Sequence, residues 1–124
     1  MKIVNDRIKL STKGAGDLLD ITRAVAQKVE QSKLQTGNVT VFVVGSTAGI
    51  TTFEYEPGLI RDMREFYDNM APADRQYHHD ETWGDANGFS HIRATFTGPS
   101  LTLLSCWKAV MSFQNASMCL FSQL

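Results

Sequence analysis

Grouped basic residues and long apolar runs are both missing from this chain of 124 residues, and each absence excludes a class of partner. The 12 lysines and arginines stand against 13 acidic residues, giving a formal net charge of -1, and no segment accumulates basic side chains. Because nucleic-acid binding requires grouped Lys and Arg to neutralise phosphates, no nucleic-acid partner is expected. No apolar run approaches the roughly 20 residues of a membrane helix, so no membrane partner is expected either.

A secretory signal and a dense set of cysteines are missing as well. The opening MKIVNDRIKL lacks the long apolar core of a signal peptide, which favours a cytoplasmic protein. Only two cysteines occur, Cys106 and Cys119, both in apolar surroundings near the end of the chain. In a cytoplasmic protein such cysteines are expected to be core residues. A disulfide across two paired strands is the alternative.

Internal repeats, linkers and low-complexity segments are also absent, so residues 1–124 are predicted to form one domain. A chain of this length buries about two-thirds of its unfolded surface. Hydrophobic periodicity predicts two principal helices, from Leu18 to about Lys33 and from Gly58 to about Met70, with Asp17 capping the first and Pro57 opening the second. Strands are expected at Ile3–Leu10, Asn38–Val44, Ile50–Glu56 and His91–Gly98, from β-branched content or apolar–polar alternation.

One of these segments, Asn38–Val44, is nearly continuous in apolar character and is predicted to be a central strand buried on both faces. It runs into the small residues 45–49, where Ser46 and Thr47 offer hydroxyls beside backbone N–H groups. Such a turn can receive an anion. A tight turn between two strands is the alternative interpretation. The spacing is not that of a P-loop, since no Gly-Lys-Ser/Thr follows.

All three histidines lie in one segment, Tyr77–Arg93, which reads YHHDETWGDANGFSHIR. The strand expected from His91 onward places His91 and Arg93 on its polar face. The glycine-containing loop before it can bring His79, Asp80, Asp85 and Asn87 back towards that face. Loops held by a rigid element are frequent locations of catalytic and binding residues, so this segment is the main candidate site.

Two imidazoles and a carboxylate can form an open metal site that leaves room for water or a substrate oxygen. His79 and His91 are therefore candidate metal ligands, and hydrogen-bonded loop histidines are the alternative. Glu54, between two aromatic residues of an expected strand, is a candidate general base or an ion-pair partner of Arg93. Asn87 is a turn residue that can also hold one imidazole in a single tautomer.

Three motifs together resemble the YjbQ-like family, which is the secondary thiamine-phosphate synthase family. They are GSTAGITTFEYEPGLIRDM, YHHDETWGDANGFSHIRA and GPSLTL. With Gly16-Asp17 through Asp20-Ile21-Thr22, the resemblance extends from about Leu10 to Leu103. Many members have a histidine where this chain has Gly45, and the chain is similar to the subgroup with Gly-Ser-Thr at that position.

The resemblance implies an α+β fold, mainly an antiparallel sheet or sandwich with two principal helices, assembled as a homotrimer. A nearly all-apolar strand and an apolar tail favour assembly independently. The resemblance also implies a site containing Ser46, Thr47, Glu54, His79, Asn87 and His91. Some members hold a metal with the histidines of these motifs, so a divalent cation, Zn or Mg, is implied at His79 and His91.

The activity attributed to the family joins a pyrimidine diphosphate to a thiazole phosphate and releases pyrophosphate, giving thiamine phosphate. In such a transferase Ser46, Thr47 and Arg93 would hold the small phosphorylated substrate. His91 or a metal would stabilise the departing pyrophosphate and Glu54 would move a proton. The alternative is a non-catalytic trimeric protein that binds a small anionic metabolite or a metal.

The end of the chain departs from the family pattern. Members have a glycine-containing hairpin, then Gly-Thr-Trp-Gln in a strand, then an acidic residue and a basic tail. Here the segment from Ser105 reads SCWKAVMSFQNASMCLFSQL, in which only Phe113-Gln114 can be set against the Trp-Gln pair. A final strand that completes the site in relatives would therefore be altered here, and we expect a slow enzyme at best.

Overall fold

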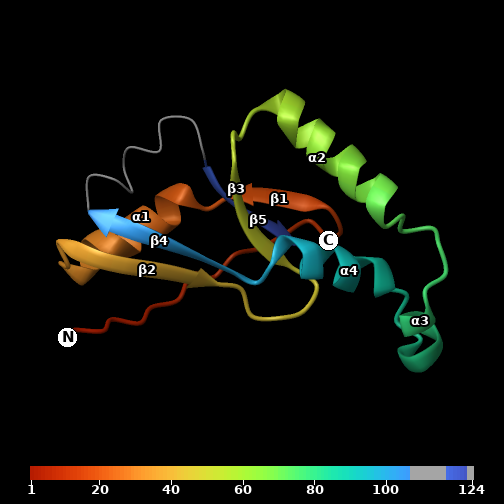
Figure 1. The fold of residues 1–124 in the computed structure, drawn as a ribbon, viewed down its shortest axis with the longest axis horizontal. Coiled ribbons are helices and arrows are strands. Elements are labelled where there is room, and N and C mark those ends of the chain that lie inside the picture. Colours follow the sequence, from red (N-terminus) through yellow and green to blue (C-terminus); the bar gives the residue numbers. More distant parts are fainter. Residues whose placement is uncertain (107–116, 123–124) are drawn as a thin grey trace.

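The computed structural model describes residues 1–106 and 117–122, and these form antiparallel strands and helices. The α+β class expected from the sequence is confirmed. Figure 1 shows the strands β2 and β4 with helix α1 at one end of the molecule and helices α2, α3 and α4 at the other. The elements are β1 (Asp17–Asp20), α1 (Thr22–Ser32), β2 (Thr36–Phe42), β3 (Gly49–Phe53), α2 (Pro57–Met70), α3 (His78–Trp83), α4 (Gly88–Thr97), β4 (Ser100–Cys106) and β5 (Ser117–Ser122).

The last strand of the chain is the central strand of the larger sheet. β5 pairs with β1 on one side and with β3 on the other, both antiparallel, so the order is β1-β5-β3. The register sets Leu19 and Ile50 on either side of Leu120. The divergent end of the sequence therefore still supplies a sheet strand, whereas Phe113 and Gln114 lie outside the described residues.

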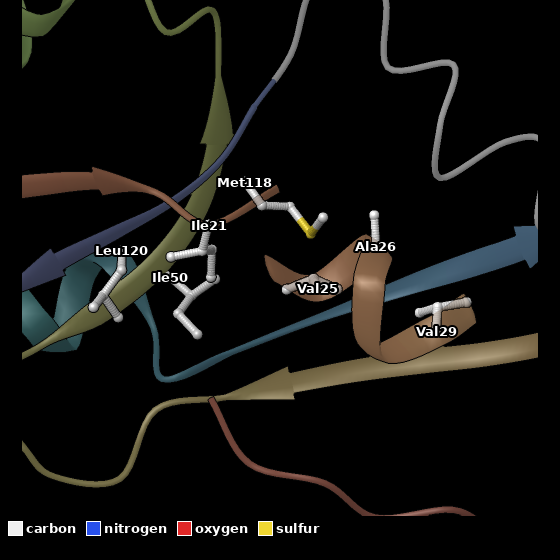
Figure 2. Packing of buried hydrophobic residues seen from close by; sticks show 7 residues of the cluster. All are labelled: Ile21, Val25, Ala26, Val29, Ile50, Met118 and Leu120. Carbon is white, nitrogen blue, oxygen red and sulfur yellow. The ribbon is translucent and has the colours of Figure 1, made fainter. Parts of the chain in front are cut away.

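Alternate side chains of β5 enter two different hydrophobic clusters, as the period of two in a strand requires. Met118 and Leu120 pack with residues from α1 and β3 (Figure 2), and Cys119 packs on the opposite face. Met118 and Cys119 are both fully buried. The cluster drawn in Figure 2 contains Ile21, Val25, Ala26, Val29, Ile50, Met118 and Leu120.

The second cluster joins the other face of the sheet to α2 and α4. It contains Leu18, Tyr67, Ala94 and Cys119. The core position expected for Cys119 is confirmed, and its thiol is free. Burial raises the pKa of Cys119 to about 12, with a smaller contribution from the negative charge of Asp20. This thiol is therefore a packing group and not a nucleophile at neutral pH.

The first expected strand and the first expected cap are both wrong. Residues 1–13 form no helix or strand, and Asp17 begins β1 instead of capping a helix. The Asp17 carboxylate accepts the backbone N–H of Lys13 at 2.9 Å. The helix starts at Thr22, whose N–H donates to Asp20 at 2.9 Å. Leu18 has helical spacing from later residues, but pairing with β5, about a hundred residues away along the chain, places it in a strand.

The strand expected at His91–Gly98 is also wrong, because residues 91–97 belong to α4, which ends at Thr97. The alternation of Ile92, Ala94 and Phe96 suggested a strand, yet only Ala94 is buried, and Phe96 is 75% exposed. The buried residues of α4 are Gly88, Ser90, Arg93 and Ala94, and the last three follow the three- and four-residue spacing of a helix.

The strand Asn38–Val44 is present as β2, but its predicted burial on both faces is wrong for this chain. β2 pairs with β4 in a two-stranded ribbon. Val39 and Val41 are half-buried, while Phe42 is 61% exposed and Val44, just beyond the strand, 90% exposed.

Two other expected elements are present: the strand expected at Ile50–Glu56 overlaps β3, and the helix expected from Gly58 is α2. No helix of the described residues is long and apolar enough to cross a membrane.

The start of α2 is fixed by Glu56, which gives a testable pH dependence. Its carboxylate accepts the backbone N–H of Gly58 at 2.7 Å and also that of Leu59. The Gly58 hydrogen bond, followed by the Leu59 bond, lowers the pKa of Glu56 below 4.5. Because the pKa of Glu56 is lower in the folded state, the cap stabilises the protein at pH values above the unfolded-state pKa. This stabilisation is lost as the pH falls through the folded-state pKa.

We therefore expect Glu56→Gln to lower the unfolding temperature at neutral pH. The difference from the unsubstituted protein should shrink as the pH falls below 4.5. Thermal denaturation across this pH range measures the difference directly. A difference that stayed constant with pH would contradict the assignment of Glu56 as a charged helix cap.

Candidate functional site

The structure places His79 and His91 beside each other. His79 lies in the first turn of α3, and His91 is the fourth residue of α4. Their ring centroids are 4.3 Å apart, with the ring planes inclined at 52°. The side chain of His79 is one-third exposed. The neighbouring His78 has a fully exposed side chain and lies 3.6 Å from Glu81. Two of the three histidines therefore form a pair, which we call the histidine centre.

Asp80 holds the two helices of the histidine centre together. One carboxylate oxygen accepts the backbone N–H of Tyr77 at 3.2 Å, closing a capping box at the start of α3. The other accepts the N–H of Gly88 at 3.0 Å, at the start of α4. The hydroxyl of Tyr77 donates to the carbonyl of Pro72 at 2.8 Å, which anchors the segment to the end of α2. The sequence indicated that Asp80 could return towards His91 with the loop, but its capping role was not predicted, although its position three residues after Tyr77 is the spacing of a capping box.

Close packing of Gly88 against Tyr77 gives a second prediction. A Cβ on Gly88 would lie 2.5 Å from the Cβ of Tyr77. Gly88→Ala should therefore separate α3 from α4 and destabilise the protein by about 1–3 kcal/mol. Ala86→Gly is the matched control, because Ala86 already has a left-handed φ of 52°, which glycine adopts without strain. Urea denaturation of both variants measures the effect, and equal stability of the two would contradict it.

Two buried polar atoms of the segment that carries the histidines have no hydrogen-bond partner among the described residues. They are Nε2 of His79 and Oδ1 of Asn87. The nearest carboxylate oxygen, from Asp85, lies 3.6 Å from Nε2, too far for a hydrogen bond. Asn87 occupies the cap position of α4, but its side chain does not cap the helix. Buried polar atoms are normally satisfied by protein groups or by ordered water, so each of these two atoms is free to bind a water molecule or a ligand.

The donors of the histidine centre fit a divalent cation only as an incomplete set. Two imidazoles lie together and Asp85 is close, but the described residues contain no group of three His, Cys, Asp or Glu arranged to hold a metal. The unpartnered Nε2 of His79 is a suitable ligand atom. Imidazole favours Zn over Mg. A cation held here would take its remaining ligands from water or from an anionic substrate.

Arg93 does not face the histidine centre. Its guanidinium donates from Nε and Nη2 to the carbonyl of Ala71, at 2.9 and 2.6 Å, and from Nη2 to Asp68 at 2.9 Å. Arg93 is only 4% exposed, and its guanidinium carbon lies 5.0 Å from the ring centre of Phe89. The ion pair with Glu54 that the sequence suggested is therefore replaced by a pair with Asp68.

Glu54 and the Ser46–Thr47 turn lie at opposite ends of β3. Glu54 follows the last residue of the strand and is exposed, whereas the turn precedes its first residue. Five residues at about 3.3 Å each separate the two ends by roughly 16 Å. The start of β3 adjoins the end of α4, where Ile50 N–H donates to the carbonyl of Gly98 at 2.9 Å. Within one chain, Glu54 and the turn are therefore not brought together.

Comparison with known proteins identifies the relationship. A family described as UPF0047 protein YjbQ-like matches residues 6–110. The chain belongs to this YjbQ-like family. It is similar to a UPF0047 protein of Methanothermobacter thermautotrophicus, with 32% identity over 103 residues, covering 83% of this chain and 71% of the relative. A UPF0047 protein of Archaeoglobus fulgidus is 31% identical over 96 residues, covering 77% and 72%.

Solved structures agree with this assignment. A YbjQ-like protein of unknown function from Sulfolobus solfataricus superposes with a TM-score of 0.82 at 27% identity, covering 91% of this chain and 81% of that one. An uncharacterised YjbQ/UPF0047 protein from Clostridium acetobutylicum has the same fold, with a TM-score of 0.79 at 24% identity, covering 91% and 86%. The family resemblance and the fold expected from the sequence are thus confirmed.

Proposed function

We propose that this YjbQ-like protein binds the diphosphate of a small substrate at the histidine centre and carries out a slow transferase reaction of the thiamine-phosphate synthase type. The reaction would join a pyrimidine diphosphate to a thiazole phosphate and release pyrophosphate. The observation that carries the proposal is the pairing of His91 with His79, whose buried Nε2 has no hydrogen-bond partner among the described residues. The family resemblance supports the choice of reaction.

The roles of the side chains follow from their chemistry. Imidazoles donate hydrogen bonds to phosphate oxygens or, when protonated, attract them by their positive charge. His79 and His91 would therefore bind the diphosphate and stabilise it as it leaves. Asn87 would hold a donor group of the substrate through its unpartnered oxygen. A divalent cation, where bound, would supply further neutralisation of the diphosphate charge. Displacing a diphosphate depends mainly on positioning and charge neutralisation, so few side chains are needed.

Ser46, Thr47 and Glu54 would contribute to such a site through assembly. Within one chain, Glu54 is a full strand length from the turn, so a neighbouring subunit would have to supply one of them. Phe42 and Val44 precede the turn and are 61% and 90% exposed. Large exposed apolar side chains next to one another are typical of an interface. We therefore propose a homotrimer in which this face is covered by a second copy of the chain.

Assembly gives the third prediction. Val44→Lys should shift the protein from a trimer to a monomer at micromolar concentration, because a charge would replace an apolar contact in a desolvated position. Light scattering coupled to size exclusion measures the mass. Phe66→Lys is the matched control, since Phe66 is also exposed, at 57%, but lies on α2. A monomer mass for the unsubstituted protein would contradict the proposal.

A non-catalytic function is the second candidate, and the position of two charged residues favours it. Arg93 is bound to Ala71 and Asp68, and Glu54 is exposed just after β3, so the base and the guanidinium expected from the sequence are not held at the imidazoles by these contacts. The carboxylate described beside His79 is that of Asp85. A protein with this centre would still bind a small anion or a metal. The deciding experiment supplies both phosphorylated precursors with Mg or Zn and measures thiamine phosphate. Product from the unsubstituted protein supports the transferase, and binding without product supports the second candidate.

A further inference from the structure

A separate hollow of about 430 Å³ lies among the segment before β1, helix α2 and helix α4. We propose that it is a second binding site, for a small molecule that carries an anionic group on an aromatic body. The residues that carry the argument are Lys13, Gly16, Arg64, Tyr67, Phe89 and Arg93. The inference is independent of the reaction proposed for the histidine centre.

The hollow and the histidine centre lie on opposite sides of α4. Phe89 and Arg93 line the hollow and are four residues apart, so they share one face of the helix. His91 lies two residues from each of them, which at 100° per residue places it about 200° around the axis. A ligand in the hollow would therefore not contact His91.

The charges around the hollow favour an anion. Lys13, Arg64 and Arg93 line it together with two carboxylates, Asp17 and Asp68. Arg93 is paired with Asp68, and Asp17 accepts hydrogen bonds from backbone N–H groups. Neither the ammonium of Lys13 nor the guanidinium of Arg64 forms an ion pair with any residue of the described ranges. Unpaired cations around a concave surface attract and concentrate anions.

The walls of the hollow favour an aromatic body. Tyr67 is almost fully buried, and its hydroxyl is engaged by Thr97 at 2.6 Å, so it presents its ring. Phe89 is half-buried and already lies under the guanidinium of Arg93. Gly16 has a left-handed φ of 72° and no side chain to fill the opening. The volume lies within the roughly 300–1,000 Å³ of small-molecule sites.

The geometry assigns the parts of the ligand to parts of the hollow. The anionic group would lie between Lys13 and Arg64, and the ring would lie against Phe89. Phenyl phosphate has both features and is a suitable probe, and inorganic phosphate tests the anionic part alone. We expect saturable changes in the amide resonances of Gly14 and Gly16 when ¹⁵N-labelled protein is titrated with phenyl phosphate. Inorganic phosphate should bind about tenfold more weakly, because it leaves the aromatic wall uncovered.

Three variants distinguish this site from the histidine centre. Arg64→Gln should weaken phenyl phosphate binding at the hollow about tenfold, the usual effect of losing one charge-assisted hydrogen bond. Arg61→Gln, which removes the same charge from the same helix but outside the hollow, should leave the affinity within about twofold, as screening of a distant charge predicts. His91→Ala should also leave the Gly14 and Gly16 titration unchanged.

The proposal would be overturned by any of three results. These are no saturable change at Gly14 and Gly16 at millimolar probe, equal affinities for Arg64→Gln and Arg61→Gln, or loss of the titration in His91→Ala. Arg64 is exposed, so its substitution should not impair folding. Lys13→Gln provides a second variant on the other side of the hollow, with the same expected loss. A negative titration at the hollow would not contradict the proposal for the histidine centre, because that proposal is tested separately with the His91→Ala variant.

Discussion

His91→Ala should lower the rate of thiamine-phosphate formation by about 10²–10³-fold, the usual loss when one group that stabilises developing charge is removed. The ring centroid of His91 lies 4.3 Å from that of His79, whose buried Nε2 has no partner among the described residues. Alanine removes its donor nitrogens from the diphosphate position. The rate is measured with both phosphorylated precursors and a divalent cation at saturating concentrations.

The matched control for this variant is His78→Ala. His78→Ala removes the same group one residue from His79, but the His78 side chain is fully exposed and lies 3.6 Å from Glu81. Its rate should equal that of the unsubstituted protein. Equal rates for His91→Ala and the unsubstituted protein would contradict the assignment of the histidine centre, and with it the proposed reaction.

Arg93→Met should have the largest effect on stability, about 2–4 kcal/mol in the free energy of unfolding. Methionine keeps the apolar stem but leaves the carbonyl of Ala71, which is almost fully buried, without its two donors. An unsatisfied buried acceptor costs about 1–3 kcal/mol, and the lost contact with Phe89 adds to this. Urea denaturation followed by circular dichroism measures the change.

Asp68→Asn separates the two parts of the Arg93 contact. Asp68 is 70% exposed, so its ion pair with Arg93 is screened by water and contributes less than about 1 kcal/mol. The Ala71 hydrogen bonds remain in this variant. We therefore expect a small loss from Asp68→Asn and a large one from Arg93→Met. Losses of similar size would show that the ion pair, and not the buried carbonyl, carries the stability.

The sequence predicted the family, the fold class and the closeness of two histidines more reliably than it predicted the local elements. The motif residues around His79 and His91 have a distinctive spacing, so the family could be recognised without knowing which segments are helical. The elements that were mispredicted have patterns compatible with both a helix and a strand. Ile92, Ala94 and Phe96 alternate, yet two of the three are exposed. Leu18 has helical spacing, but a strand from the far end of the chain pairs with it.

The positions of Arg93 and Glu54 could not be derived from spacing. Arg93 is two residues from His91, which in a strand places both on one face but in a helix places them on opposite faces. Because the segment from His91 was predicted to be a strand, Arg93 was wrongly included in the predicted site. Glu54 lies eight residues from Ser46 in sequence, and a straight strand between them keeps them apart. The hollow at Lys13 and Arg64 joins three segments that only the tertiary fold brings together.

The most direct test of the histidine centre is a crystal structure of the protein grown with zinc and pyrophosphate, with data collected at the zinc absorption edge. The account predicts pyrophosphate density beside His79 and His91, and an anomalous peak about 2.0–2.1 Å from ring nitrogens of the two histidines. Ordered histidines with neither zinc nor pyrophosphate beside them, or pyrophosphate bound only elsewhere on the protein, would contradict it.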